Sequence, residues 1–250
     1  MSAEFEQIQM EPAYRKVAAA IGARIRSRAL REGARLPAET ELARQFGVNR
    51  STVREALREL ESRGLLERRP GSKLMSVSRP HQASVAAGVS DALLLHDVTA
   101  HDVWQALTIL EPPIAVAAAR ARTHADLEQI EAAASALACA ADTAQAVHRT
   151  AEVLRCIGAA THNPVLRLAQ EPLLLLLEPS LRVMIDKVPQ ARARILSAHE
   201  HLRDALARQD EAGAQTWMSR HIRDFKKGYE LAGLDVACRL SHVLRRDPRR

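Results

Sequence analysis

The stretch from Phe46 to Leu60 constrains the fold of this chain most strongly, because a glycine turn leads directly into a helical repeat. Arg50, Arg54 and Arg58 follow one another every four residues and share one face. Gly47, just before the repeat, can adopt the left-handed backbone of a tight turn. The apolar residues recur at the spacing of a second, buried face: Val53, Ala56, Leu57 and Leu60. The stretch therefore predicts a helix-turn-helix whose second helix exposes a ridge of cations.

The first turn of this helix is suited to an anion. Asn49 stands where a side chain can cap the free N–H groups of the turn. Ser51 and Thr52 add hydroxyl groups beside those N–H groups, and a helix N-terminus itself favours negative charge. DNA phosphate is the anion that this arrangement predicts.

The charge of the chain is unevenly distributed. The net charge is +6; residues 1–79 hold 16 lysines and arginines against 10 acidic residues, whereas residues 80–250 hold 20 of each kind. A basic nucleic-acid-binding module joined to a neutral domain has this asymmetry. Charge alone also leaves open a solvated basic surface without a partner.

The composition favours a helical protein with two domains. The 250 residues, of which 47% are hydrophobic, are enough for two modest cores. Aromatic residues make up only 3%, and Ala, Leu, Arg and Glu dominate, which favours helices over strands. We predict a mainly α fold.

The sequence also predicts where the protein works. Cys139, Cys156 and Cys238 are widely spaced and odd in number, which argues against a disulfide framework or a thiolate zinc site and for reduced, cytosolic thiols. Residues 1–10 lack the apolar run of a signal peptide. The apolar run Leu173–Leu177 is too short to span a bilayer. We expect a cytoplasmic protein that does not bind membranes.

The sequence of residues 1–79 predicts a winged helix-turn-helix. A helix opened by Pro12 precedes a short helix from Ala38 to Phe46 and the helix described above, which Gly64 ends. Two short apolar and basic segments then flank Pro70-Gly71-Ser72 and predict a small β-hairpin, the wing. Residues 11–78 are long enough for this fold.

Residues 80–250 are expected to form an antiparallel all-α bundle, because short polar interruptions separate the helical patterns. Prolines 112, 113, 172 and 179 should bend or interrupt these helices, and the basic tail Arg239–Arg250 should be mobile. The predicted helices are Ser84–Leu95, Asp102–Ala121, Ala125–Cys139, Thr143–Thr161, Pro164–Val188, Pro189–Arg208 and Glu211–Leu231.

The motifs of both parts resemble one known family. In the first part, the segments that resemble the DNA-binding domain of GntR-family bacterial transcription regulators are Arg35-Leu36-Pro37-Ala38-Glu39, Glu41-Leu42-Ala43, Phe46 to Arg50, Val53 to Leu57, Leu60 and Gly64-Leu65-Leu66. In the second part, the segments that resemble the FCD ligand-binding domain of the FadR branch are Leu110-Glu111-Pro112, Ala160 to Pro164, His199, Leu202, Asp204-Ala205, Asp210, Met218 and His221.

The resemblance implies roles for the DNA-binding residues. It assigns base and phosphate contact to Arg50 and Arg54, phosphate contact to Ser51 and Thr52, and approach to the minor groove to Gly71; Asn49 completes this candidate site. The alternative is that the arginines are ordinary surface residues that pair with glutamates four positions away. The chain departs from many relatives at two positions, with Thr40 in place of an arginine and Lys73 in place of a second wing glycine.

The resemblance also bears on metal binding. Many FCD domains hold a divalent metal with an aspartate and three histidines. His199 and His221 match two of these positions, but Thr150 and Leu154 stand at the other two. Two imidazoles alone make a weak site, so we expect no metal and no other cofactor. Leu107 replaces an arginine that often faces the effector carboxylate, which favours a less acidic or more apolar ligand.

Three interpretations of His199 and His221 remain open: ligands of a residual metal site, hydrogen-bond partners of an effector, or buried core histidines. With Leu107, Thr150 and Leu154 they form the candidate effector site.

The functional hypothesis is a homodimeric repressor that binds a palindromic operator and responds to a small molecule, such as a carboxylic acid. Two alternatives come from other classes: a non-specific architectural DNA-binding protein, and a helical enzyme that uses His199 and His221. No nucleophile and base pair can be assembled from the spacing, so we expect a protein without catalytic residues.

Overall fold

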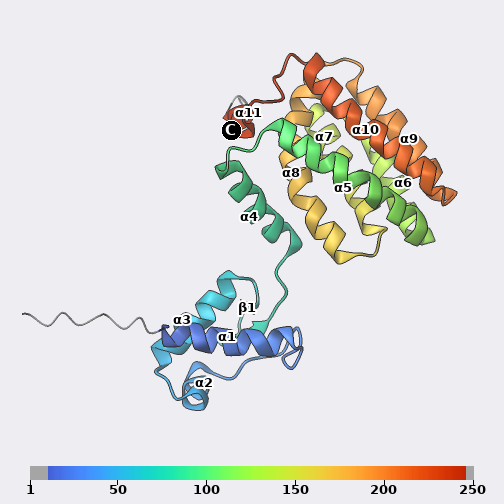
Figure 1. Cartoon of the computed structure of the whole chain (residues 1–250). Helices are drawn as coiled ribbons and strands as arrows, with labels where there is room; N and C mark the ends of the chain where they lie inside the picture. Colours follow the sequence, from blue (N-terminus) through green and yellow to red (C-terminus); the bar gives the residue numbers. More distant parts are fainter. Residues whose placement is uncertain (1–10, 246–250) are drawn as a thin grey trace, which may run out of the picture. The chain divides into compact units, whose positions relative to one another are not determined.

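The computed structural model describes residues 11–245 and separates into two compact units, with the division after Gln82 (Figure 1). Each unit has its own cluster of buried apolar side chains. The predicted fold class is confirmed: a small two-stranded antiparallel sheet follows the helix-turn-helix, and the second unit is helical.

The first unit has the element order of a winged helix. Its elements are α1 (Ala13–Arg26), α2 (Glu39–Phe46), α3 (Arg50–Ser62), β1 (Leu66–Arg68) and β2 (Met75–Val77). Val53, Ala56, Leu57 and Leu60 of α3 are buried, as their spacing predicts. Gly47 ends α2 with φ of 65°, a left-handed conformation that glycine adopts without the steric cost of a Cβ atom. The turn between α2 and α3 is thus the one that the sequence predicts.

The wing contains a third segment that the sequence analysis did not identify. β1 and β2 pair with Leu66 opposite Val77 and Arg68 opposite Met75. On its other side β2 bonds to the connection between α1 and α2: Leu36 N donates to Met75 O at 2.8 Å, and Val77 N donates to Ala34 O at 2.9 Å. The hairpin is therefore anchored on both edges of β2.

The second unit contains eight described helices. They are α4 (Gln82–Leu95), α5 (Ala100–Ala121), α6 (His124–Ala138), α7 (Thr143–Ala159), α8 (Pro164–Lys187), α9 (Ala191–Ala207), α10 (Glu211–Leu231) and α11 (Leu240–Arg245). Several begin at side-chain caps that fix their ends. Thr99, for example, accepts from Asp102 N at 3.2 Å while the Asp102 carboxylate accepts from Thr99 N at 2.9 Å.

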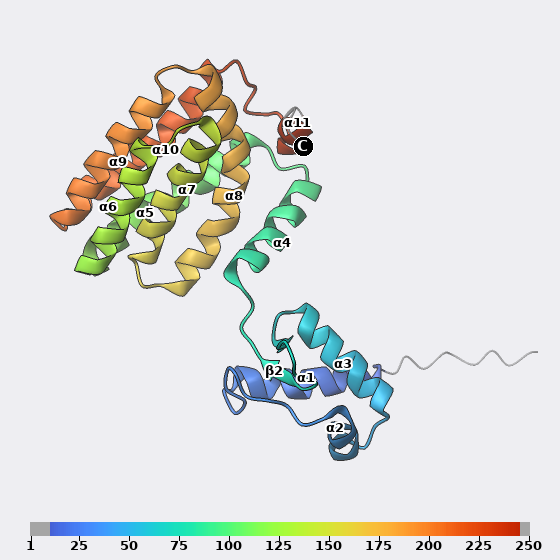
Figure 2. The same cartoon turned by 180° about the vertical axis from the view of Figure 1, so that it is seen from behind.

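The core of this unit lies around α5, which packs closely against α10. Seen from behind, α6, α7 and α9 cover α5 from the opposite side (Figure 2). Buried apolar side chains from α5, α7, α8, α9 and α10 belong to one continuous cluster. The interior of the unit is therefore shared by helices that are far apart in the sequence.

Three expectations about this unit need correction. Pro112, Pro113, Pro172 and Pro179 were expected to bend or interrupt helices; the interruption is wrong, because α5 and α8 run continuously through them, and the bend stays a prediction. The predicted mobile tail is helical at Leu240–Arg245, where Leu240 and Val243 are buried against the core; its last residues, 246–250, lie outside the described residues, as do residues 1–10. Several helix ends also differ by one or two positions from the predicted ones. Between residues 11 and 245, no helix is long and apolar enough to cross a membrane.

Candidate DNA-contact surface and effector region

The predicted DNA-contact side chains gather at the exposed N-terminal half of α3. The side chains of Arg50 and Arg54 are 60% and 47% exposed. Ser51 is also exposed, and Thr52 is partly buried. Because the apolar face of α3 is buried, the arginine face is directed away from the core.

Asn49 occupies the N-cap position of α3 but does not cap it. Its backbone is extended, as expected at an N-cap, yet its side chain makes no capping hydrogen bond. The expectation of a side-chain cap was therefore wrong. The exposed Asn49 amide and the first N–H groups of α3 are left for an anion or a base edge.

Both arginines contact one carboxylate at the start of α2. Glu39 Oε2 lies 3.0 Å from Arg50 Nε and 3.0 Å from Arg54 Nη2. The hydrogen bond from Arg54, followed by that from Arg50, lowers the pKa of the Glu39 carboxyl. The arginines do pair with a glutamate, as the alternative expected, but this partner is 11 and 15 residues away in the sequence and not four. Sequence reasoning missed Glu39 because this contact depends on how α2 packs against α3.

Gly71 lies at the exposed tip of the hairpin. Its φ is 75°, and a Cβ atom added there would meet nothing within 4 Å. Open space around the backbone is what an approach to a DNA groove requires. Lys73 is exposed on the same turn and supplies a positive charge.

The five candidate effector residues are all buried in the second unit, but they do not form one cavity. Leu107 and Leu154 are fully buried, and the Thr150 hydroxyl donates to Ala146 O of its own helix at 2.7 Å. His199 and His221 contact each other. Of the five, Leu107 alone lines the cavity described below. His221 lines a separate cavity of about 20 Å³ with residues of α8, α9 and α10.

His199 of α9 and His221 of α10 form a buried pair. Their Nε2 atoms lie 3.1 Å apart, and the His199 Nδ1 atom has no hydrogen-bond partner. An unpaired acceptor is less costly than an unpaired N–H donor, so we assign the shared proton to His199 Nε2. Burial lowers the pKa of His199 to about 4, and burial followed by the charge of His199 holds the pKa of His221 well below 6.5. Both rings are neutral at physiological pH.

The residues present do not fit the divalent metal that FCD domains often hold. Such a site needs carboxylate and imidazole ligands, and at the two remaining family positions this chain has Thr150 and Leu154. The Thr150 hydroxyl is already engaged by its own helix. Among residues 11–245, no cluster of three or more His, Cys, Asp or Glu side chains is arranged to hold a metal ion.

A second buried polar pair links α5 and α8. Gln170 Nε2 donates to both carboxyl oxygens of Glu111 at 3.1 Å and to Leu154 O at 3.1 Å. Burial raises the pKa of Glu111 to about 7. Gly158 permits this arrangement, because a Cβ atom there would collide with Gln170 Oε1. Glu111 lies in the helical register of Leu107, which marks it as a core position, but Gln170 gave no sequence signal.

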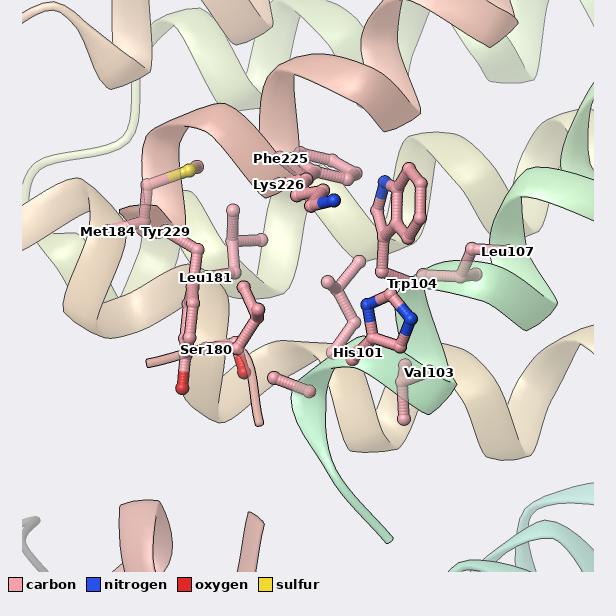
Figure 3. A pocket seen from close by; sticks show the side chains of 13 residues that line it. His101, Val103, Trp104, Leu107, Ser180, Leu181, Met184, Phe225, Lys226 and Tyr229 are labelled. Carbon is pink, nitrogen blue, oxygen red and sulfur yellow. The ribbon is translucent and has the colours of Figure 1, made fainter. Parts of the chain in front are cut away.

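A small cavity lies between α5, α8 and α10 (Figure 3). Its volume is about 30 Å³, which is enough for one or two water molecules and far less than a metabolite needs. The apolar part of its lining includes Val103, Leu107, Leu181, Met184 and Phe225. A metabolite could enter only if these side chains moved apart.

The surface of this cavity is almost entirely apolar, although residues at two of its ends carry polar groups. The Tyr229 hydroxyl is buried without a partner at hydrogen-bonding geometry, although the Ser180 hydroxyl lies beside it in Figure 3. At the other end, Lys226 Nζ lies 4.5 Å from the centre of the Trp104 ring. The centre of the His101 ring lies 5.7 Å from that of the same tryptophan. Sequence reasoning missed these residues because nothing in their spacing distinguishes them from ordinary helix positions.

Comparison with protein families divides the chain in the same way. Residues 13–74 match the family of bacterial regulatory proteins of the gntR type, and residues 102–224 match the FCD domain. The LutR transcriptional regulator of Bacillus subtilis is 27% identical over 220 residues, which cover 82% of this chain and 97% of LutR. The putative L-lactate dehydrogenase operon regulatory protein of Escherichia coli is 28% identical over 213 residues, which cover 83% of this chain and 82% of that protein.

Among solved structures, a GntR protein of Streptococcus agalactiae is similar in fold. The superposition gives a TM-score of 0.61 at 23% identity and covers 86% of this chain and 99% of that protein. The two chains therefore share the arrangement of their elements.

Proposed function

Because this chain belongs to the GntR family of bacterial transcription regulators and carries an FCD effector-binding domain, we propose that it is a repressor that binds a palindromic operator as a homodimer. It is a DNA-binding regulator and not an enzyme. The relatives named above are also regulators. We take residues 1–79 as the DNA-binding domain and residues 80–250 as the domain for effector binding and dimerisation. Because operator DNA lies in the bacterial cytoplasm, we expect the protein to act there.

The observation that carries the proposal is the exposed pair Arg50 and Arg54 at the start of α3. The two side chains lie one helical turn apart on a helix whose opposite face is buried. An arginine can donate two parallel hydrogen bonds to guanine O6 and N7 in the major groove. Ser51, Thr52 and Asn49 are suited to hold the adjacent phosphate, and Gly71 would bring the wing backbone to the neighbouring groove.

A homodimer accounts for the use of one short recognition helix. A single helix contacts only a few base pairs, whereas two helices related by a twofold axis read two half-sites about one DNA turn apart. A non-specific architectural protein would not need a second unit with buried polar pairs of its own. A measurement of binding stoichiometry tests the palindrome and the dimer together, because both require two protein chains on each operator.

We propose that the effector enters the cavity between α5, α8 and α10. At the family positions, His221 lines only a smaller cavity of about 20 Å³, whereas this cavity adjoins Leu107, and its lining residues include Tyr229 and Lys226, which carry a hydroxyl group and a cation. A small carboxylic acid with an apolar body matches these groups, with its carboxylate near Lys226. The name of the Escherichia coli relative, which refers to an L-lactate dehydrogenase operon, adds carboxylic acids to the candidates.

A larger groove competes for this role. It has a volume of about 900 Å³ and is lined by parts of α4, α8 and the segment after α10. Asp91, Glu178, Asp186 and Asp235 line it against Arg182 and Lys187. Its excess of carboxylates would repel an acidic effector, so we assign the effector to the smaller cavity.

The test is a titration of promoter fragments with purified protein, with and without L-lactate and benzoate. We expect one or a few fragments to bind with twofold-symmetric footprints, and one acid to weaken their binding. A bound effector acts only through a difference in affinity between the DNA-binding and DNA-free arrangements. Equal binding to every fragment with no effect of either acid would contradict the proposed function.

A further inference from the structure

A single carboxylate connects the two helices of the helix-turn-helix. Glu39, in the first turn of α2, accepts from Arg50 Nε at 3.0 Å, from Arg54 Nη2 at 3.0 Å and from Arg54 Nε at 3.3 Å. The Glu39 side chain is only 22% exposed, which is less than half the exposure of either arginine. The acid therefore lies behind the two guanidinium groups, on the side of the protein.

The hydrogen bonds to Glu39 leave the outer ends of both arginines available. Arg50 uses only its Nε, so its two Nη groups keep all their hydrogens. Arg54 uses Nε and one hydrogen of Nη2, which leaves Nη1 and the second hydrogen of Nη2. A guanidinium can contact guanine O6 and N7 through this pair of Nη atoms. Both arginines are thus held by one edge and keep the other for a base.

The same contact has two opposite effects on DNA binding. Fixing long side chains before binding removes part of the conformational entropy that ordering them in the complex would cost. A negative charge beside the arginines also weakens their attraction to phosphates, and this attraction supplies most of the affinity for DNA of any sequence. Removing the charge should therefore favour random DNA and disfavour the cognate sequence.

We infer that Glu39 is a positioning residue that sets sequence specificity by holding Arg50 and Arg54 in the geometry for base contact while it reduces binding to non-cognate DNA. This inference rests on the proposed function, in which the two arginines contact operator DNA. It adds a role for an acidic residue that is itself not placed against the DNA.

The chain offers a matched control for this role. Glu41 also lies in the first turn of α2, and it pairs with Arg44 and Gln45 instead of a residue of α3. Glu41→Gln changes the net charge by the same amount as Glu39→Gln and removes the same favourable charge from the helix N-terminus. The two variants differ in whether the arginines of α3 lose their partner.

The experiment uses the full-length protein and two DNA duplexes. The first is a fragment that the wild-type protein selects from a randomised duplex pool, and the second has the same bases in shuffled order. Fluorescence anisotropy gives the dissociation constant of each protein for each duplex at two salt concentrations. Thermal unfolding of each variant checks that the fold is intact, and Glu39→Asp provides a second variant that keeps the charge but shortens its reach.

We expect Glu39→Gln to bind the shuffled duplex more tightly than the wild type and the selected duplex more weakly, so that the ratio of the two constants falls about tenfold or more. Glu41→Gln should tighten binding to both duplexes and leave the ratio unchanged. Glu39→Asp should give a ratio between those of the wild type and Glu39→Gln. An unchanged ratio in Glu39→Gln, which includes an equal loss of affinity for both duplexes, would overturn this inference and leave the proposed function standing. A wild type that selects no sequence would overturn the proposed function and the inference with it.

Discussion

His199 Nε2 and His221 Nε2 lie 3.1 Å apart in the interior of the second unit, where both side chains are almost fully buried. One ring must donate and the other accept, so this contact exists only while at least one of the facing nitrogens is without a proton. Protonation of both rings would place two positive charges in contact without a carboxylate beside them. The pair therefore ties the stability of the second unit to pH.

The first prediction concerns acid. Histidine has a pKa near 6.5 in the unfolded state, and His199 has a pKa of about 4 in the folded state. Between about pH 4 and 6.5 the unfolded state therefore binds more protons than the folded state. The contribution of His199 to the free energy of unfolding should be constant above about pH 7 and fall as the pH drops from about 6.5 to 4, by about 3 kcal/mol. Because Glu111 titrates over the same range with the opposite sign, this contribution is measured in a Glu111→Gln background. Urea unfolding across this range measures the loss. A His199→Asn variant that shows the same slope would contradict the assignment.

The second prediction concerns Glu111, whose pH dependence has the opposite sign. Its folded pKa is about 7 and its unfolded value about 4.5, so the unfolded state loses its proton first as the pH rises. The contribution of Glu111 to stability should fall by about 3 kcal/mol between about pH 4.5 and 7 and then level off, which offsets the His199 contribution over the same range. Glu111→Gln should abolish this fall and be more stable than the wild type at pH 8. The exposed Glu128→Gln serves as the control and should change neither slope nor midpoint.

The third prediction concerns base contact by Arg54. Arg54→Ala should weaken binding to the selected operator by about 1 to 3 kcal/mol, because one arginine that contacts a base is worth about this much. Arg44→Ala removes an exposed cation from α2 and should cost only its small electrostatic share. Band-shift titrations at constant salt compare the two. Equal losses would mean that Arg54 contributes charge and no base contact.

The fourth prediction concerns metal. Protein purified without chelators should contain far less than one equivalent of zinc, nickel or manganese by elemental analysis, because two neutral imidazoles lack the carboxylate and third histidine of a complete site. Restoring the ligands with Thr150→Asp and Leu154→His should raise the metal content. A full equivalent in the wild-type protein would show that other side chains complete the site.

The fifth prediction concerns the cavity. Tyr229→Phe removes the buried hydroxyl without changing the shape of the ring, so the acid that releases DNA should be needed at about five to ten times the concentration. Tyr14→Phe in the first unit is the control and should respond as the wild type does. Unchanged sensitivity in Tyr229→Phe would mean that the effector makes no contact with this hydroxyl, either in the cavity or in the groove beside α8, because Tyr229 lines both.

The parts of the fold that depend on local patterns could be predicted from the sequence. The apolar spacing of Val53 to Leu60 and the glycine at position 47 fix the helix-turn-helix, because helical periodicity and left-handed turns are properties of short segments. The prediction of a side-chain cap at Asn49 was wrong, because a residue type that suits the N-cap position does not always make the capping hydrogen bond. The predicted interruption of α5 at Pro112 and Pro113 was wrong, because a helix that is packed against its neighbours can tolerate the lost hydrogen bonds.

The candidate sites were less accessible from the sequence. Arg50 and Arg54 could be found because an i, i+4 spacing puts them on one face, but the contact with Glu39 requires the packing of two helices. His199 and His221 are 22 residues apart, and only the antiparallel arrangement of α9 and α10 brings their rings together. The pairing of Glu111 with Gln170 across 59 residues is of the same kind. Contacts between distant segments are set by tertiary structure, which a single sequence does not display.

The bonding of β2 to the connection between α1 and α2 means that the wing is not an independent flap. Leu36 is bonded to Met75 at the base of the wing, and three residues later Glu39 opens α2 against the arginines of α3. The segment that pairs with the wing therefore leads directly into the residue that contacts Arg50 and Arg54. The DNA contacts proposed for the wing and for α3 would accordingly not be independent of each other.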